Sequence, residues 1–336
     1  VPAPITATFF IILVLLLRYV RIKSKLGSKI NDMFWKMIIF IMFFPLLLQS
    51  QENNVLPYSH ITLDSVVISA VKQGLSINDL IKVMQYDSTL YIAFNNLHFT
   101  NYQYRHDLSV LDKREKTEAY KKESVRQIYK DKCRQQSIES VEMKGDFQNR
   151  KGHDKYYTVE LFDNTLYNEH SVCGEKRKTN WNNEVYGSKL EGHLGAVKRV
   201  IFNPGTPVDL PLIGKKFAIF EPEMQAFYNY SIDRKMVAGE ECFVFSVIEK
   251  PEYSNTRKDI IVRKLITAFR RSDFQIIQRV YHMEYQGALV KLDIAMDMKL
   301  TAIDNKFYPE QIKYDGFFKA PTKKAERVKF TTDFKY

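Results

Sequence analysis

Residues 290–300, VKLDIAMDMKL, decide the fold because apolar and polar side chains alternate along them. A period of two residues is that of a β-strand, in which successive side chains point to opposite faces of a sheet. The stretch therefore predicts a strand with one apolar face buried in a core and one polar face exposed to solvent. The apolar face carries Val290, Leu292, Ile294, Met296, Met298 and Leu300.

The same alternation extends to both sides of this stretch, from residue 217 to residue 336. The residues between the strands form short turns such as Arg271-Ser272-Asp273, Gln286-Gly287 and Asp304-Asn305. Short turns join neighbouring antiparallel strands, so this half of the chain is predicted to be an antiparallel meander. The predicted strands cover residues 227–233, 241–248, 259–269, 274–285, 289–300, 309–314 and 327–334.

A helical pattern over residues 59–97 precedes the strands. Ser76 and Asp79 have the spacing of an N-cap and its capping-box partner, and Asp87 or Ser88 can cap a second short helix. The apolar stripes of these helices are of the kind that faces a core. Residues 59–97 are therefore predicted to be amphipathic packing helices.

The middle of the chain gives less regular signals. Residues 113–136 fit a helix nearly as well as a strand, and both assignments stay open. Residues 138–147 and 155–163 flank a turn-like stretch around a glycine, which predicts a β-hairpin. Residues 164–215 contain many Gly, Asn and Pro and predict a long connection, with a helix near residues 192–201.

The three cysteines predict one disulfide and one buried thiol. Cys133 and Cys173 both lie in polar surroundings and are expected to pair in an oxidising compartment. Cys242 lies in the run ECFVF and is expected to be a small buried residue of a strand. His170 and Cys173 form a His-x-x-Cys motif that could supply two metal ligands. No second pair of residues with the spacing of metal ligands follows, so no metal site is predicted.

Two apolar segments near the start of the chain predict export. Residues 1–17 carry no charge, residues 37–48 form a second apolar run, and the stretch between them is basic. The favoured interpretation is a signal peptide at residues 33–51, with residues 1–32 upstream of the mature protein. The alternative is a two-helix membrane hairpin, although both runs are short for a bilayer that needs about 20 apolar residues. Either interpretation places residues 52–336 outside the cytoplasm, as a single exported domain.

The composition excludes several classes of protein. With 45% hydrophobic residues, 13 Gly and 11 Pro among 336 residues, the chain is neither disordered nor collagen-like. Of the net charge of +11, +5 lies in the basic stretch between the two apolar segments, and the remaining +6 is spread over scattered short basic runs, whereas a nucleic-acid binder gathers its basic charge on one face. The sequence contains no hydrolase elbow, zinc-binding helix, phosphate-binding loop or dinucleotide fingerprint. It therefore predicts neither nucleic-acid binding nor a cofactor, and it favours a protein without catalytic activity.

The C-terminal part also resembles known proteins. The runs that carry this resemblance are GEECFVFSV (239–247), IIVRKLITAFRRSDFQIIQRVYHMEY (260–285), DIAMDMKL (293–300) and FYPEQIKYDG (307–316). They resemble uncharacterised cell-envelope proteins of Gram-negative bacteria and, more distantly, the family of the periplasmic lipoprotein carrier and the outer-membrane lipoprotein receptor. Residues 266–277 look like the strand, turn and strand unit of that family, with Phe269 where an aromatic residue is usual. The resemblance covers residues 228–334, whereas residues 52–215 are longer and more polar than the family leads us to expect.

The resemblance implies an α+β fold. The antiparallel sheet would be strongly curved, an open half-barrel with a few helices on its concave side and an apolar cavity for acyl chains. The function implied is that of a non-enzymatic cell-envelope protein, in the periplasm or on the outer face of the envelope, with a lipid or lipoprotein as partner. The candidate residues for the cavity lining are Val290, Leu292, Ile294, Met296, Met298 and Leu300.

Two alternative functions stay open. A periplasmic hydrolase whose catalytic residues converge only in the fold would show no motif in its sequence. An outer-membrane β-barrel is suggested by the terminal alternation of Val328, Phe330, Thr332, Phe334 and Tyr336. Against the barrel, Arg279 interrupts the apolar face of its predicted strand. Membrane contact through the N-terminal segment is expected only if that segment is not cleaved.

Overall fold

The computed structural model describes the chain from residue 76 onward, with internal gaps. The described residues are 76–148, 155–163, 171–177, 189–208, 213–254, 260–320 and 323–336. The expected signal peptide at 33–51, the upstream residues 1–32 and the first part of the helical stretch 59–97 lie outside them. The described helices include none that is both long and apolar enough to cross a bilayer.

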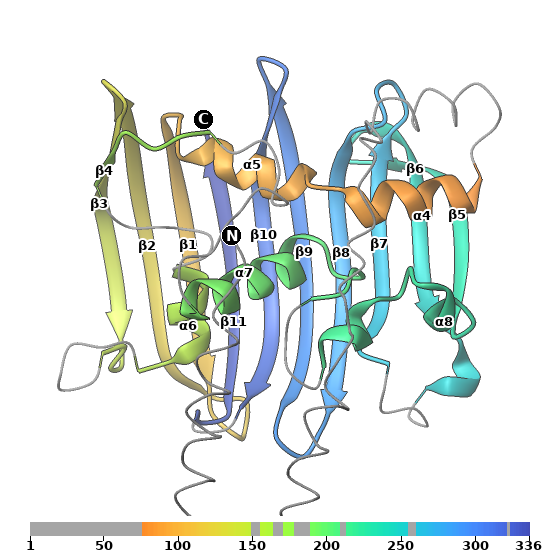
Figure 1. Ribbon diagram of the computed structural model, residues 1–336. Coiled ribbons are helices and arrows are strands. Elements are labelled where there is room, and N and C mark those ends of the chain that lie inside the picture. Colours follow the sequence, from red (N-terminus) through yellow and green to blue (C-terminus); the bar gives the residue numbers. More distant parts are fainter. Residues whose placement is uncertain are drawn as a thin grey trace, which may run out of the picture. The chain divides into compact units, whose positions relative to one another are not determined.

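Eleven strands form one antiparallel sheet, which is open rather than closed on itself (Figure 1). Its order is β4-β3-β2-β1-β11-β10-β9-β8-β7-β6-β5, so two meanders meet where the first long strand, β1, pairs with the last strand, β11. The strands are β1 (Tyr102–Leu111), β2 (Thr117–Lys130), β3 (Cys133–Lys144), β4 (Val172–Cys173), β5 (Tyr228–Val237), β6 (Glu240–Glu249), β7 (Val262–Arg270), β8 (Ile276–Gln286), β9 (Lys291–Ile303), β10 (Lys306–Lys319) and β11 (Glu326–Lys335).

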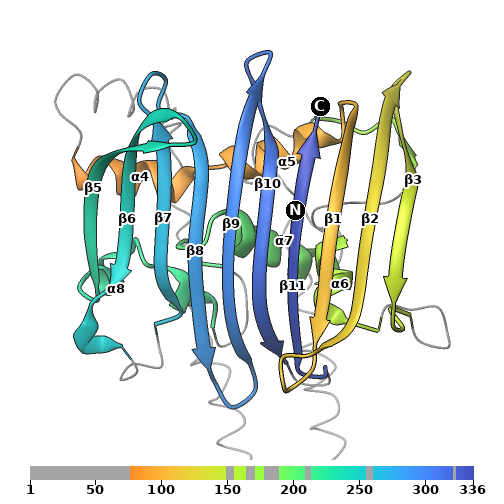
Figure 2. The same ribbon diagram turned by 180° about the vertical axis from the view of Figure 1, so that it is seen from behind.

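The described helices lie over one face of this sheet, and the view from behind has the strands in front of them (Figure 2). The α-helices are α4 (Ile77–Tyr86), α5 (Thr89–Leu97), α6 (Tyr157–Phe162), α7 (Lys189–Phe202) and α8 (Pro222–Gln225), and the short 3-10 helices are η3 (Gly214–Phe217) and η4 (Pro251–Tyr253). An open antiparallel sheet with a few helices confirms the predicted fold class. Two chemically different faces result, one covered by helices and one bare.

The seven strands predicted between residues 227 and 334 are confirmed as β5 to β11. In β9 the predicted apolar face turns toward the helices, with Met298 fully buried, while the alternate residues face away. The turn between β9 and β10 contains Asp304 and Asn305, both with φ near +50 to +60°. Asp and Asn tolerate this left-handed conformation better than most residues, which explains why they form a tight hairpin turn.

The helical start is anchored by the predicted caps. The Ser76 side chain accepts a hydrogen bond from the Asp79 backbone N–H, and the Asp79 carboxylate accepts one from the Ser76 N–H, which completes a capping box. Asp87 accepts hydrogen bonds from the backbone N–H and hydroxyl of Thr89 at the start of α5. Of the ambiguous residues 113–136, residues 117–130 form β2 and residues 133–136 begin β3, with turns before and between the two strands.

Residues 155–163 contradict the predicted hairpin, because they contain helix α6 and no second strand. The Glu326 carboxylate caps this helix from β11, accepting hydrogen bonds from the backbone N–H groups of Tyr157 at 2.8 Å and Thr158 at 2.9 Å. A cap so distant in sequence has no local signature. It overrides the β-propensity of Tyr, Thr and Val in this stretch.

A buried ion pair fixes the helices to the sheet. Arg279 of β8 is 0% exposed, and its guanidinium lies 2.9 Å from the Asp87 carboxylate between α4 and α5. It also donates to the Phe202 carbonyl at the end of α7, at 2.6 Å. Asn203 adds a hydrogen bond from its side chain to the Met84 carbonyl. Because a buried charge is costly unless it is paired and hydrogen-bonded, this network holds three helices in one position over β8.

Candidate functional site

An apolar cavity of about 110 Å³ lies between the sheet and helices α6 and α7. Its floor comes from β8, β9 and β10, and its cover comes from the two helices. None of the lining side chains is charged. They are Tyr157, Thr158, Leu161, Phe162, Val197, Val200, Ile201, Tyr281, Met283, Leu292, Ile294, Tyr314 and Phe318.

Helix α6 is held over the floor by its Glu326 cap and by ring contacts. The Phe162 ring meets Tyr314 edge-on at a centroid distance of 4.7 Å and Phe330 at 4.9 Å. Tyr157 stacks on Phe318 at 5.6 Å. A helix of six residues is too short to be stable alone, so these tertiary contacts determine where it lies.

Helix α7 is held by hydrogen bonds at its C-terminal end. The Tyr281 hydroxyl donates to the Ile201 carbonyl at 3.2 Å and also contacts the Met296 sulfur at 2.8 Å. Burial raises the pKa of Tyr281 and of Tyr314 well above the ordinary tyrosine value. Both phenols therefore stay neutral at physiological pH, and the cavity gains no charge from them.

The six predicted lining residues divide into two groups. Leu292 and Ile294 line the cavity. Met298 and Leu300 are buried in the core, and Met296 is buried with its sulfur in contact with the Tyr281 hydroxyl. Val290 is partly buried against the same core. The structure thus brings two of the six candidates to the cavity and places the other four in ordinary packing.

The lining from α6 and α7 was missed by sequence reasoning. The spacing of Ala196, Val197, Val200 and Ile201 is a helical apolar stripe, and it could have identified the face of α7 that meets the sheet. Leu161 and Phe162 give no such signal, because the pattern of residues 155–163 predicts a strand.

The cavity as it stands is smaller than a lipid site. Pockets for small ligands typically measure about 300–1,000 Å³, and an apolar cavity of about 150 Å³ admits one benzene. A volume of about 110 Å³ accommodates only the end of an acyl chain. A longer chain enters only if α6 and α7 separate from β8, β9 and β10.

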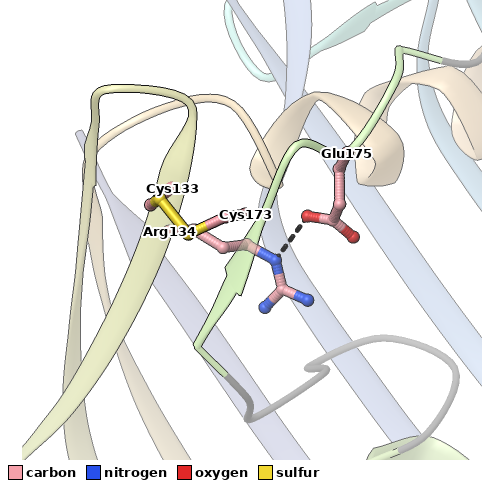
Figure 3. The surroundings of a disulfide bond; sticks show 4 residues. All are labelled: Cys133, Arg134, Cys173 and Glu175. Atoms are coloured by element: carbon pink, nitrogen blue, oxygen red, sulfur yellow. Dashed lines mark hydrogen bonds and ion pairs between the residues drawn. A yellow bond between two sulfur atoms is a disulfide. The ribbon is translucent and has the colours of Figure 1, made fainter.

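Cys133 and Cys173, the predicted disulfide pair, are joined in the structure with an S–S distance of 2.01 Å (Figure 3). The bond ties β4 to the start of β3. Beside it, the buried Arg134 contacts the Glu175 carboxylate at 2.7 Å, and His98 contacts the other oxygen of Glu175 at 3.1 Å. Residues 171–177 therefore connect β3 to the C-terminal end of α5.

The ion pair between Arg134 and Glu175 keeps the Glu175 carboxyl group ionised. Burial raises the pKa of Glu175, but the hydrogen bond from Arg134 and the neighbouring His98 lower it by more, so the net shift is downward. Desolvation lowers the pKa of His98. Cys173 is occupied by the disulfide, His170 lies outside the described residues, and the described part of the chain contains no group of three metal-ligating side chains. Cys242 is a free, buried strand residue, as predicted.

The bare face of the sheet has a larger groove of about 610 Å³, but its chemistry is different. Asp315 pairs with Lys329 at 2.8 Å and with Arg327 at 2.9 Å. His282 and Asp293 share a hydrogen bond of 2.8 Å. Opposite charges that neutralise one another, as those of Asp315 and its two partners do, are typical of a solvated surface. The apolar cavity under α6 and α7 is therefore the stronger candidate site.

Comparisons with known proteins find few similarities. No protein-family model matches the chain, and no curated protein does. Among solved structures, it aligns with a protein assigned as an outer membrane lipoprotein-sorting domain from Vibrio parahaemolyticus, over 74% of this chain and 92% of that one, with a TM-score of 0.22. A LolA superfamily protein from Nitrosomonas europaea aligns over 75% and 92%, also with a TM-score of 0.22. A DUF1329 family protein from Desulfovibrio piger aligns over 75% and 91%, with a TM-score of 0.21.

Each of these three structures shares 9% of its aligned residues with this chain. Two of the three are named for lipoprotein sorting or for the LolA superfamily, and the chain's resemblance to this group of proteins is accordingly distant.

Proposed function

We propose that this protein is an exported, non-enzymatic protein of the cell envelope that binds the apolar part of a lipid or lipidated ligand beneath α6 and α7. The observation that carries the proposal is the cavity between the helices and β8, β9 and β10, whose lining contains no charged side chain. Export is supported by the apolar and basic pattern of residues 1–51 and by the disulfide between Cys133 and Cys173.

The energetics of such a site follow from burial of methylene groups. Each buried CH₂ contributes about 0.8 kcal/mol, so a chain that fills more of the space under the helices binds more tightly. The cover is suited to moving because α6 is short and depends on a cap and three ring contacts for its position. Entry of an acyl chain would exchange the contacts of Phe162 with the sheet for contacts with the ligand.

The test is a titration of the purified full chain with a fluorescent fatty acid. We expect saturable binding with a micromolar dissociation constant. The substitution Val200→Trp places an indole in the cavity and should weaken binding at least tenfold. The matched control is Val208→Trp, because Val208 is also a partly buried valine on the same core but does not line the cavity.

Three results would count against the proposal. Absence of any acylated molecule in organic extracts of the purified protein, together with no probe binding at micromolar concentration, would remove it. Equal loss of binding in both tryptophan variants would show that the probe binds elsewhere. Export is tested separately by fusing a reporter enzyme that is active only outside the cytoplasm to the C-terminus, and an inactive, full-length fusion would contradict it.

A further inference from the structure

The outermost row of the cavity lies where β8 and β10 end and β9 begins. Tyr285 of β8, Leu292 of β9 and Phe318 of β10 are directly opposite one another in the sheet. Leu292 and Phe318 line the cavity. Two neighbouring strand spacings make this row about 10 Å wide. This row lies between the rest of the apolar lining and the ends of the three strands.

A lysine lies at each end of this row. Lys216 Nζ is 4.6 Å from the centre of the Tyr285 ring and donates a hydrogen bond to its hydroxyl at 3.3 Å. At the other end, Lys323 Nζ is 4.5 Å from the centre of the Tyr157 ring, which stacks on Phe318. Cation–π contacts of this kind hold an ammonium group against an aromatic surface. The cavity therefore has a positive charge on both sides of its outer end.

The next row of the sheet increases the positive charge. Lys291 of β9 is directly opposite Lys319 of β10. Like charges in this position repel one another and destabilise the strand pair. Within the described residues, neither lysine forms an ion pair. The side chains of both lysines start from the opposite face of the sheet. Both residues lie at the ends of their strands, however, where a long lysine side chain can extend past the strand end toward the cavity.

The two acidic groups at the Lys323 end do not cancel the charge of that lysine. Glu160 lies 4.0 Å from Lys323 Nζ, and both side chains are more than 40% exposed, so the pair is weak. Glu326 is engaged by the backbone of α6. The cavity thus combines an uncharged apolar interior with a cationic outer end.

We propose that the ligand is an anionic amphiphile, with its acyl chain under α6 and α7 and its carboxylate or phosphate head group at the outer end of the cavity, where it pairs with Lys216 or Lys323. This inference rests on the proposed function, because it assigns the head group of the ligand whose chain enters the cavity. Lys291 and Lys319 contribute a more distant attraction, which salt screens. A neutral lipid gains the apolar contacts and none of the charge.

The test compares ligands that have the same saturated chain and different head groups. The full chain is titrated with an alkyl carboxylate, an alkyl phosphate, the methyl ester and the primary amine, each in competition with a fluorescent acyl probe. We expect both anions to bind about tenfold more tightly than the ester, and the amine to bind most weakly. The relative affinities of the carboxylate and the phosphate identify which anion the site prefers. Raising the salt concentration should reduce the preference for anions.

The double variant Lys216→Gln/Lys323→Gln should bring the ratio of anion to ester affinity close to one. Its matched control is Lys264→Gln/Lys313→Gln, which removes two lysines from the groove on the bare face and should keep the ratio. Equal affinities for anion and ester in the unmodified protein would overturn the inference and leave the proposed function standing. Failure of all four ligands to compete would remove the proposed function itself.

Discussion

Strands β9 and β3 each have an apolar face, but the surroundings of the two faces are opposite. β9 alternates apolar with polar residues, and in β3 an irregularity in the pairing with β2 brings Ile138, Val141 and Met143 onto one face. Met298 of β9 is 0% exposed, whereas these three β3 residues are 63%, 55% and 56% exposed. The register places these three β3 residues on the face that carries the helices in the rest of the sheet. In the part of the chain that the structure describes, helices cover β9 and leave β3 open.

The comparison shows that alternation predicts a strand and its two faces, but not whether the apolar face is buried. Burial is decided by elements elsewhere in the sequence. β9 is stabilised by the helices packed on it, and β3 depends on its pairing with β2, on the disulfide and on the Arg134–Glu175 contact. The predictions that follow test this division.

The largest effect is expected from Arg279→Leu. This substitution leaves the Asp87 carboxylate buried without its partner, which costs about 3–5 kcal/mol of the free energy of unfolding. Urea denaturation followed by circular dichroism measures it. As a control, Lys299→Leu removes a positive charge from the bare face of β9 and should change stability by less than about 0.5 kcal/mol. A loss below about 1 kcal/mol in Arg279→Leu would mean that the network does not hold the helices.

Two methionines compare the covered and open strands directly. Met298→Ala should destabilise the protein by about 2–5 kcal/mol because it leaves a cavity in the core. Met143→Ala removes the same side chain from β3 and should cost less than about 0.5 kcal/mol. Both values come from the same denaturation experiment. Equal losses would show that another part of the molecule covers β3.

Loss of the disulfide should affect β3 more than β9. The double variant Cys133→Ala/Cys173→Ala should lose about 4 kcal/mol of stability, the value expected for closing a loop of this length. Hydrogen exchange should become faster in β3 and β4 and stay unchanged in β8 and β9. A reductant should destabilise the unmodified protein by a similar amount and leave the variant unaffected. Uniform acceleration of exchange in all strands would contradict the local role of the bond.

The smallest effect is a loss of stability at acidic pH. It originates at His106 of β1, a strand that lies between β3 and β9 in the sheet. Burial and the nearby Lys121 lower the pKa of His106 to about 3, whereas an unfolded histidine titrates near 6.5. The unfolded chain therefore binds the proton more tightly, and the stability contributed by neutral His106 is lost as the pH falls from about 6.5 toward 3.

Between pH 7 and pH 5 this amounts to about 2 kcal/mol, measured by urea denaturation at each pH. The variant His106→Asn should show a flatter dependence on pH. His282→Asn, which makes the same change at a histidine on the bare face, is the matched control. Identical profiles for the two variants would exclude His106 as the origin.

Much of the sheet was predictable because its signals are local. The alternation of residues 290–300 and the Asp304-Asn305 turn each act over a few residues, and so does the Ser76 cap. Of the candidate site, only the part of the lining that comes from the sheet was predictable. Leu292 and Ile294 follow from the strand period, but the cover does not, because α6 is fixed by Glu326, a residue on the last strand. Arg279 was visible as an interruption of an apolar face, and only the fold reveals that Asp87 neutralises it.

Because β1 pairs with β11, the sheet can be completed only after the last strand of the chain has been synthesised. His106 and Thr332 meet across this seam, although 226 residues separate them. During synthesis the first meander emerges long before the strand that completes it, and β1 presents an unpaired edge until the last residues follow. Contacts of such long range form slowly and expose partly built sheets to aggregation. The growing chain therefore needs protection from neighbouring chains until its final strand is in place.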